Sequence, residues 1–492
     1  MRQLGGIDSM FVRAETPSMH LHVVGVQILA AGGVDTQTTE GVASSTEGIR
    51  ERIRSLVRQR LPLLPPFRWR LIEAPGGLGA PCWIEDPEFD LDRHIRCVTL
   101  PEPGSRVELE RFVAEVAGRP LARDRPLWEM HLVDGLHDGS LAVVAKLHHA
   151  FMDGGAGSEV MASLFDLEPG EPRPAPSDPW RPDEVPSGWR LATGVPGVVL
   201  ARVGRLPAAL SHTTTGMGGL LGAMFPGAEG GASVSAAPRT PFNGPLTSDR
   251  VVALADCSLA EVKRVKSAFG VTVNDVVLAA VASALRAELR AIDALGDLAE
   301  RPLVVAVPVS VRPSELEREF GNHTSAMMVP LPAHIDDPVE RLSVIHDLAI
   351  RTKERHRAMG SELLEVWAGL MPPWLVSVGA RALGLVGRVG LLPPVFNAIV
   401  SNVPGPPIPL YLAGIEVSAT YPLGPLIEGV GLNITVLSQR DTLHIGLIAE
   451  PGLVAHPEAI ATGVAAGVDE LLALASPPRE RSDVRPTSGS SR

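Results

Sequence analysis

The feature that most restricts the fold is a nearly continuous apolar run at residues 141–149, Leu-Ala-Val-Val-Ala-Lys-Leu-His-His. A run of this length and composition predicts a strand buried on both faces, which needs a sheet with covering layers on both sides. Residues 128–133 form a second strand-like segment, and His137-Asp138-Gly139-Ser140 between the two is a tight-turn sequence. We therefore expect the two strands to be antiparallel neighbours.

Strand-like and helix-like segments alternate along the chain, which predicts an α/β fold with mixed (α+β) sheets. Near the N-terminus, residues 20–29 favour a strand and residues 47–60 favour a helix. Further on, Ser258 and Thr272 are expected to cap two successive helices, the first of which Gly270 can close. The other expected elements are strands at 250–255, 303–311, 325–331, 397–402, 415–420, 432–437 and 443–448, and a closing helix at 456–474.

The chain has 492 residues, more than one hydrophobic core usually supports, so two domains are expected. The composition shifts to Pro, Gly, Ser and Ala between the two halves, which indicates a connecting segment. We predict an N-terminal domain at 1–168, a connection at 169–245 with room for a helix at 189–210, and a C-terminal domain at 246–475. Residues 476–492, rich in Pro, Ser and Arg, are predicted to be a disordered tail.

Charge and composition disfavour several classes of protein. A formal net charge of −12 argues against nucleic-acid binding, which relies on clustered Lys and Arg. The three scattered cysteines, Cys82, Cys97 and Cys257, indicate neither a disulfide framework nor a zinc ribbon, and a reducing cytoplasm is the simplest compartment. No signal peptide is evident. The uncharged stretch at 389–415 is broken by prolines and cannot be one membrane helix, whereas residues 370–392 suit either an interfacial segment or a core helix.

The apolar run ends in two imidazoles and a glycine-rich turn, His148-His149-Ala150-Phe151-Met152-Asp153-Gly154. Successive side chains of a strand point to opposite faces, so one histidine can act in a cavity while the other supports it. A neutral His is a suitable general base near pH 7 once a neighbour orients it, and Asp153 lies in the turn that could do so. Gly154 leaves room for the backbone to approach a substrate. A buried histidine pair with a purely structural role remains an alternative, and no further His or Cys lies at metal-ligand spacing.

The same run matches the HHxxxDG motif of the coenzyme-A-dependent acyltransferase superfamily, which also includes peptide-synthetase condensation domains. The rest of the chain, apart from the connection and the tail, resembles the bacterial wax ester synthase/diacylglycerol acyltransferase family. The ordered motifs that support this resemblance are Phe89-Asp90-Leu91-Asp92-Arg93-His94, Pro126-Leu127-Trp128-Glu129, Asn243-Gly244-Pro245, Asn274-Asp275-Val276-Val277-Leu278-Ala279, Ser401-Asn402-Val403-Pro404-Gly405-Pro406 and Leu432-Asn433-Ile434-Thr435-Val436-Leu437-Ser438. One hairpin turn, Gln439-Arg440-Asp441-Thr442, departs from the family, which tends to carry an aromatic residue and then Gly there.

The resemblance implies two chloramphenicol-acetyltransferase-like domains around a central channel that both substrates enter. It implies direct transfer: His149, as general base, removes the proton of an acceptor hydroxyl, which then attacks the acyl-CoA thioester. In this scheme His148 is supporting, Asp153 is orienting and structural, and Gly154 provides backbone room.

Other site residues are less specified. Asp153 would need a cationic partner if buried, and Arg123 and Arg125 are both candidates. Asn274 and Ser401 are candidate substrate-binding residues. The alternatives are a helix cap for Asn274 and a rigid turn for the segment that begins at Ser401. Trp128 is expected in the core rather than at the substrate.

The predicted function is therefore transfer of a long-chain fatty acyl group from acyl-CoA to diacylglycerol, to a long-chain alcohol, or to both. Acyl-CoA is a co-substrate, and no permanently bound cofactor and no metal are expected. The expected location is the cytoplasm, with peripheral contact to the inner membrane face or to lipid droplets. Two alternatives stay open: condensation-domain-like transfer from a carrier-protein thioester, and a non-catalytic lipid-surface protein with the same fold.

Overall fold

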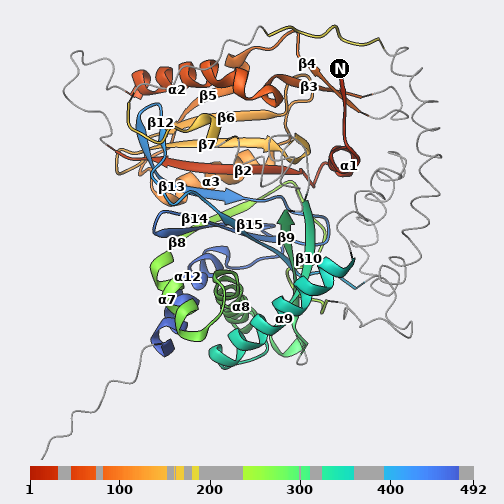
Figure 1. Ribbon diagram of the computed structural model, residues 1–492, viewed down its shortest axis with the longest axis vertical. Coiled ribbons are helices and arrows are strands. Elements are labelled where there is room, and N and C mark those ends of the chain that lie inside the picture. Colours follow the sequence, from red (N-terminus) through yellow and green to blue (C-terminus); the bar gives the residue numbers. More distant parts are fainter. Residues whose placement is uncertain are drawn as a thin grey trace, which may run out of the picture.

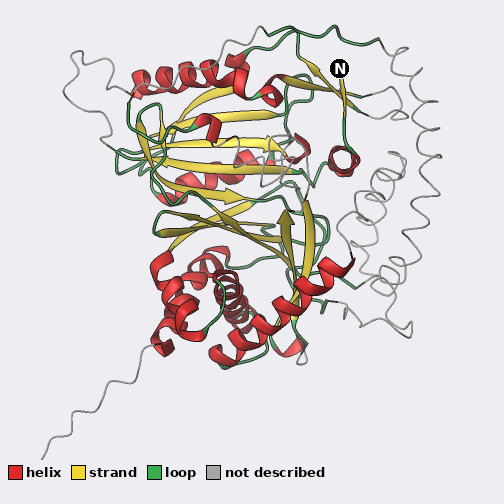
Figure 2. Ribbon diagram, in the orientation of Figure 1, coloured by secondary structure: helices red, strands yellow, loops and turns green. Residues whose placement is uncertain are grey.

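The computed structural model describes residues 1–31, 46–73, 81–151, 160, 162–170, 180–187, 237–298, 301–310, 324–359 and 393–475. Within these residues, two six-stranded sheets lie one above the other, with helices packed against both of them (Figures 1 and 2). Asp153, Gly154 and several predicted segments lie outside the described residues: the helix at 189–210, the interfacial segment at 370–392 and the tail at 476–492.

The first sheet has the strand order β12-β13-β2-β7-β6-β5. Its strands are β2 (His22–Leu29), β5 (Ile95–Thr99), β6 (Trp128–Asp134), β7 (Leu141–His148), β12 (Tyr411–Leu412) and β13 (Ile415–Leu423). β5 and β6 are parallel and the other neighbours antiparallel, so the sheet is mixed as predicted. The expected hairpin of β6 and β7 is confirmed, and Gly139 in its turn has a φ of 73°. Helices α2 (Thr46–Arg60) and α3 (Arg106–Gly118) pack on opposite faces, as a strand apolar on both sides requires.

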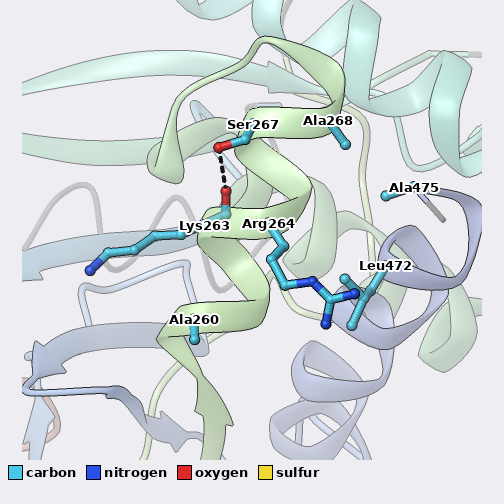
Figure 3. A pocket seen from close by; sticks show the side chains of 7 residues that line it. All are labelled: Ala260, Lys263, Arg264, Ser267, Ala268, Leu472 and Ala475. Atoms are coloured by element: carbon cyan, nitrogen blue, oxygen red, sulfur yellow. Dashed lines mark hydrogen bonds between the residues drawn. The ribbon is translucent and has the colours of Figure 1, made fainter.

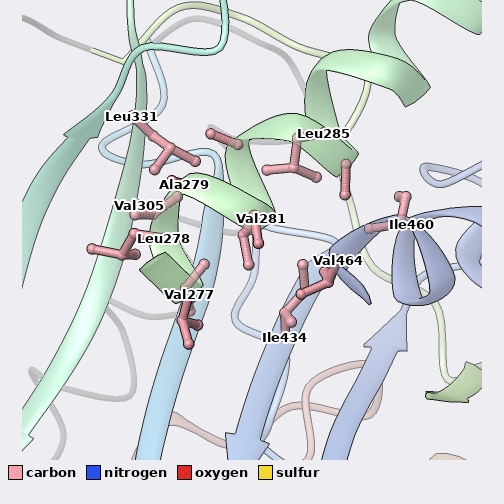
Figure 4. Close-up of a cluster of buried hydrophobic side chains, with 14 of the residues drawn as sticks. Val277, Leu278, Ala279, Val281, Leu285, Val305, Leu331, Ile434, Ile460 and Val464 are labelled. Atoms are coloured by element: carbon pink, nitrogen blue, oxygen red, sulfur yellow. The ribbon is translucent and has the colours of Figure 1, made fainter. Parts of the chain in front are cut away.

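The second sheet has the order β10-β9-β11-β14-β15-β8 and is also mixed, because β11 runs parallel to both β9 and β14. Its strands are β8 (Val251–Ser258), β9 (Leu303–Ser310), β10 (Thr324–Leu331), β11 (Ala398–Pro404), β14 (Leu432–Gln439) and β15 (Thr442–Ala449). The helices on its outer side are α7 (Leu259–Phe269), α8 (Val273–Ala291), α9 (Pro338–Met359) and α12 (Pro457–Ala475) (Figure 1). Buried side chains of α8 such as Val281 and Leu285 fill the space between this sheet and α12 (Figure 4), and each contributes about 1.5–3 kcal/mol of burial free energy.

The sequence predicted the succession of α7 and α8 from its caps, and the structure confirms it. The Ser258 hydroxyl accepts a hydrogen bond from the Glu261 backbone N–H at the start of α7. Gly270 ends that helix in the left-handed conformation, with a φ of 68° that a residue without Cβ adopts most easily. Thr272 and Asp275 then form a capping box at the start of α8.

The C-terminal half of the chain contributes two strands to the first sheet. β12 and β13 belong to the C-terminal part of the sequence, yet β13 pairs with β2 and extends the first sheet. Residues from both sheets, including Val26, Leu254 and Tyr421, share one apolar core. Division of the chain into domains at 1–168 and 246–475 stays a prediction. The strand pairing adds that residues 411–423, from the C-terminal part of the chain, belong to the first sheet.

A polar cluster joins the sheets beside this core. We call Asp256, His444, Tyr421 and Arg106 the Asp256 cluster. The Asp256 carboxylate lies 2.7 Å from His444 Nδ1, accepts a hydrogen bond from the Tyr421 hydroxyl at 2.9 Å and pairs with Arg106 at 3.0 Å. These residues come from β8, β15, β13 and α3, so the cluster connects both sheets to a helix of the N-terminal half.

Smaller elements complete the N-terminal half. β1 (Arg2–Gln3), β3 (Trp69–Ile72) and β4 (Cys82–Glu85) form a three-stranded sheet, and helix α1 is Gly6–Ala14. In the part of the chain that is described, no single helix has the length and apolar character to cross a membrane. Among these described residues, α7 and α8 taken together, with a bend of 104° between them, pass that test.

Candidate active site

The turn that holds His149 begins where β7 ends. β7 lies between β2 and β6, stops at His148, and is followed by a 3-10 turn at His149–Phe151. Two backbone N–H groups of this turn have defined partners: His149 N–H donates to the Leu21 carbonyl at 2.8 Å, and Ala150 N–H donates to His148 Nδ1 at 2.9 Å. The backbone on both sides of the His149 Cα is thereby held.

The two adjacent imidazoles have different surroundings. His148 is buried and its Nε2 lies 3.2 Å from the Glu15 carboxylate. His149 is half-buried, and its ring stacks on Phe11 of α1 with a centroid separation of 4.5 Å and an interplanar angle of 20°. A half-buried imidazole fixed by a ring stack is suited to proton transfer at near-neutral pH, whereas the inner one is suited to support.

Glu15 is the centre of a cluster that the sequence did not reveal. We call Glu15, His22, His148 and Arg123 the Glu15 cluster. Oε1 of Glu15 lies 3.3 Å from His22 Nε2, and Arg123 pairs with Oε2. Burial opposes ionisation of Glu15, but its contacts with both imidazoles and with Arg123 outweigh burial and hold its pKa well below the usual range. Burial lowers the pKa of His22 to about 4 despite the neighbouring carboxylate.

Ligand atoms of Glu15, His22 and His148 lie within 4.8 Å of one another, a grouping that could hold a metal ion. Their existing contacts favour a network of close charged and polar pairs instead. The Ala150 N–H donates to Nδ1 of His148, so the proton of the neutral ring is on Nε2, which faces Glu15 and is then no metal ligand. The guanidinium of Arg123 on the same carboxylate would also repel a cation.

His22 and His148 are directly opposite in the antiparallel pairing of β2 with β7. A search for metal-ligand spacing along the sequence misses this pair because the two residues are brought together by strand register. The signal that could have found them is that His22 lies near the start of one predicted strand and His148 at the end of another, once the two strands are known to be antiparallel neighbours.

The predicted arginine partners of Asp153 have other partners. Arg123 pairs with Glu15, and Arg125 pairs with Asp124 at 2.9 Å. Since Asp153 lies outside the described residues, its orienting role stays a prediction.

The two candidate substrate-binding residues lie in the second half of the molecule. Asn274 is half-buried in the first turn of α8, where the cap is made by Thr272 and Asp275, and Asp275 also lies 2.7 Å from His346 Nδ1. Ser401 is in β11, opposite Thr435 of β14. Among the described residues, the polar contacts of His148 involve Glu15 and Ala150 and neither of these candidates. Their roles stay predictions.

Several other motif residues are structural. Trp128 is buried in the core as predicted, donates from Nε1 to the Phe67 carbonyl at 2.8 Å, and stacks on His94 at 4.4 Å. His94 is itself buried with its Nδ1 2.8 Å from the Trp128 carbonyl oxygen, and burial lowers its pKa to about 4. Two motifs separated in the sequence therefore form one packed pair, with His94 just before β5 and Trp128 at the start of β6.

The structure also describes the segment after Ser401 and the hairpin turn at 439–442. At Gly405 an added Cβ would lie 2.1 Å from the Ser438 carbonyl oxygen, so the segment after Ser401 passes too close to β14 for any other residue. The unusual turn at 439–442 still closes the hairpin, because Gln439 pairs with Thr442 and Arg440 adopts a φ of 53°. The departure from the family pattern therefore leaves the hairpin intact.

One groove lies away from the histidine turn, between α7 and α12 (Figure 3). It has a volume of about 430 Å³ and is lined by Ala260, Lys263, Arg264, Ser267, Ala268, Leu472 and Ala475. Two basic side chains at an open helix surface provide no group for acyl transfer.

Comparison with known proteins identifies the class to which this fold and site belong. The model of the wax ester synthase/diacylglycerol acyltransferase catalytic domain matches residues 4–277, and that of the C-terminal domain of the same family matches residues 320–472. The chain belongs to the wax ester synthase/diacylglycerol acyltransferase family.

Individual relatives agree with this assignment. The chain is 36% identical over 481 residues to a putative diacylglycerol O-acyltransferase of Mycobacterium tuberculosis, with 96% of each chain covered. It is similar to the solved structure of the wax ester synthase/diacylglycerol acyltransferase from Marinobacter aquaeolei VT8, with a TM-score of 0.69, 27% identity, and 96% and 100% of the chains covered. The first condensation domain of the calcium-dependent antibiotic synthetase has the same fold, with a TM-score of 0.54, 16% identity and 97% of each chain covered.

Proposed function

We propose that this protein transfers a long-chain acyl group from acyl-CoA to the hydroxyl of a diacylglycerol or of a long-chain alcohol. The observation that carries the proposal is the position of His149: half-buried, stacked on Phe11, and held in a turn at the end of a buried strand in a chain of this family. The resemblance to a condensation domain, at 16% identity, concerns the fold alone.

In the proposed reaction His149 removes the proton from the acceptor hydroxyl as its oxygen attacks the thioester carbonyl. The tetrahedral intermediate then collapses, the carbon–sulfur bond breaks, and the imidazolium returns the proton to the leaving thiolate. The products are the ester and free coenzyme A, and no acyl-enzyme forms. His148 supports the turn, and we place Asp153 and Gly154 in orienting and spacing roles.

The proposal also includes the co-substrate, the route of the two substrates and contact with a lipid surface. Acyl-CoA acts as co-substrate, and the two substrates meet at His149 from a channel between the two halves. Because both acceptor types partition into lipid, we infer peripheral contact with a membrane or lipid-droplet surface. Val395 precedes β11 in the sequence and Ile408 follows it, and their side chains are 67% and 43% exposed. These are apolar groups available for such contact.

The test uses the full chain with palmitoyl-CoA and either a diacylglycerol or hexadecanol, and follows release of free coenzyme A. Replacing His149 with Ala is expected to lower the turnover rate by about 10²- to 10⁴-fold, because a general base is lost. His137→Ala is the control, since this histidine is exposed in the hairpin turn before β7. Full activity of His149→Ala would contradict the proposal. Lipid binding without release of coenzyme A from any acceptor would favour a non-catalytic lipid-surface protein, and activity only with carrier-protein thioesters would favour the condensation reaction.

A further inference from the structure

Glu15 directly follows α1 and reaches the histidine turn through one carboxylate oxygen. Its Oε1 accepts a hydrogen bond from the Leu21 backbone N–H at 3.2 Å and lies 3.2 Å from His148 Nε2. The side chain is only 14% exposed, and Arg123 pairs with its other oxygen. Glu15 therefore contacts both the Leu21 backbone and the His148 ring, and each of these two groups contacts the turn that contains His149.

The first path runs through the ring of His148. Because Ala150 N–H donates to Nδ1, the Nε2 atom of the neutral ring bears the proton and faces the Glu15 carboxylate. A carboxylate anion 3.2 Å from Nε2 favours that tautomer and that ring orientation by electrostatic attraction. The hydrogen bond to Ala150, on the C-terminal side of His149, therefore depends on Glu15.

The second path runs through the backbone of Leu21. The Leu21 N–H donates to Glu15 while the Leu21 carbonyl accepts from the His149 N–H at 2.8 Å. The N-terminal side of His149 is thereby linked to the same carboxylate. Both peptide groups that flank the His149 Cα are held by residues that Glu15 positions.

We propose that Glu15 is a positioning residue that fixes the His149 turn from both sides, with Arg123 holding its carboxylate in place. This inference rests on the proposed function, because it concerns the placement of the base in that reaction. A base displaced by about 1 Å can lose about 10²-fold in rate without any change in its own chemistry. Removal of the Glu15 charge should therefore act on turnover more than on binding of acyl-CoA.

The decisive variant is Glu15→Gln, which keeps the shape of the side chain and removes its charge. We expect kcat to fall about 10- to 100-fold while KM for palmitoyl-CoA stays within about twofold. Glu15→Asp, which keeps the charge on a shorter side chain, should recover part of kcat. In a His148→Ala background, Glu15→Gln should lower kcat by a smaller factor than in the unaltered chain, because one of the two paths is already broken.

Glu129→Gln is the matched control. Glu129 is a carboxylate in β6 of the first sheet, 18% exposed, paired with buried Lys146 at 2.8 Å and lying 3.5 Å from His131. Its loss should reduce thermal stability and leave kcat per folded molecule unchanged. If Glu15→Gln and Glu129→Gln lower kcat per folded molecule equally, or if Glu15→Gln keeps full kcat, the positioning role is rejected. If Glu15→Gln fails to fold, Glu15→Asp and Arg123→Gln decide the question, and unchanged kcat in both rejects it.

Two further results separate this inference from its alternatives. Loss of activity on treatment with EDTA, restored by Zn²⁺, would overturn the metal-free arrangement in favour of a metal held by Glu15, His22 and His148. Full activity of His149→Ala would reject the proposed function itself, whereas an inactive His149→Ala together with a fully active Glu15→Gln would reject only the role of Glu15.

Discussion

The Glu15 cluster and the Asp256 cluster are built from the same parts, a carboxylate, imidazole and guanidinium, but they are attached to different structures. Glu15 accepts a hydrogen bond from the Leu21 backbone and lies beside the turn of the proposed base. Asp256 contacts side chains from β15, β13 and α3 and lies between the two sheets. The comparison teaches that a carboxylate–imidazole pair does not by itself indicate a role in the reaction. We expect such a role only where the pair also fixes the backbone beside the proposed base.

The largest expected effect comes from replacing one imidazole in each cluster, His148 or His444, with alanine. His148→Ala should lower kcat by about 10- to 100-fold, because Ala150 N–H loses its acceptor and the base is displaced. His444→Ala should leave kcat within about twofold, although loss of a buried partner of Asp256 should lower thermal stability. Steady-state kinetics with palmitoyl-CoA and thermal melting of both variants provide the measurement. Equal losses of kcat would remove the distinction between the clusters.

A second effect, on acid stability, is expected from His22 of the Glu15 cluster, in addition to that of buried His94, whose pKa is also lowered to about 4. His22 is buried and its pKa is lowered to about 4, so between its ordinary value and pH 4 the unfolded chain binds the proton and the folded chain does not. The free energy of unfolding should therefore fall as the pH falls through this interval, by about 2–3 kcal/mol from this group. His22→Gln should remove this part of the pH dependence in denaturant titrations at pH 7 and pH 4.

The control for that titration is His137→Gln, because His137 is exposed and its replacement should leave the pH dependence unchanged.

The lowered pKa of Glu15 also makes the free energy of unfolding depend on pH. Its stabilising contribution is fully present above the ordinary pKa of a glutamate and is lost progressively as the pH falls from there through its lower folded value, mostly below the interval assigned to His22. A His22→Gln variant with the acid sensitivity of the unaltered chain would contradict the assignment.

The smallest effect should come from Tyr421→Phe in the Asp256 cluster. The Tyr421 hydroxyl donates to Asp256 at 2.9 Å and accepts from Arg106 at 2.9 Å, and its loss should lower the free energy of unfolding by about 1 kcal/mol. Because Tyr421 contacts no part of the histidine turn among the residues that the structure describes, kcat should not change. A loss of kcat beyond about twofold per folded molecule would indicate that the sheet contact reaches the turn of His149.

Local patterns were sufficient for much of the fold. The apolar run before His148 predicted β7 and its neighbour β6, and the Ser258, Gly270 and Thr272 caps predicted the succession of α7 and α8. These elements depend on contacts between residues close in the sequence, where periodicity, turn residues and caps act directly. The position of Trp128 in the core follows from the same reasoning.

By itself, the sequence determined the α/β class, the strand that ends in two histidines, and the family to which the chain belongs. Only the tertiary structure decided that β13 extends the first sheet, that His22 lies opposite His148, and that Glu15 reaches both. The physical reason is that strand register and side-chain burial join residues far apart in the sequence, as His148 is from both His22 and Glu15. No local pattern specifies such contacts, because each depends on where the whole sheet places its neighbours.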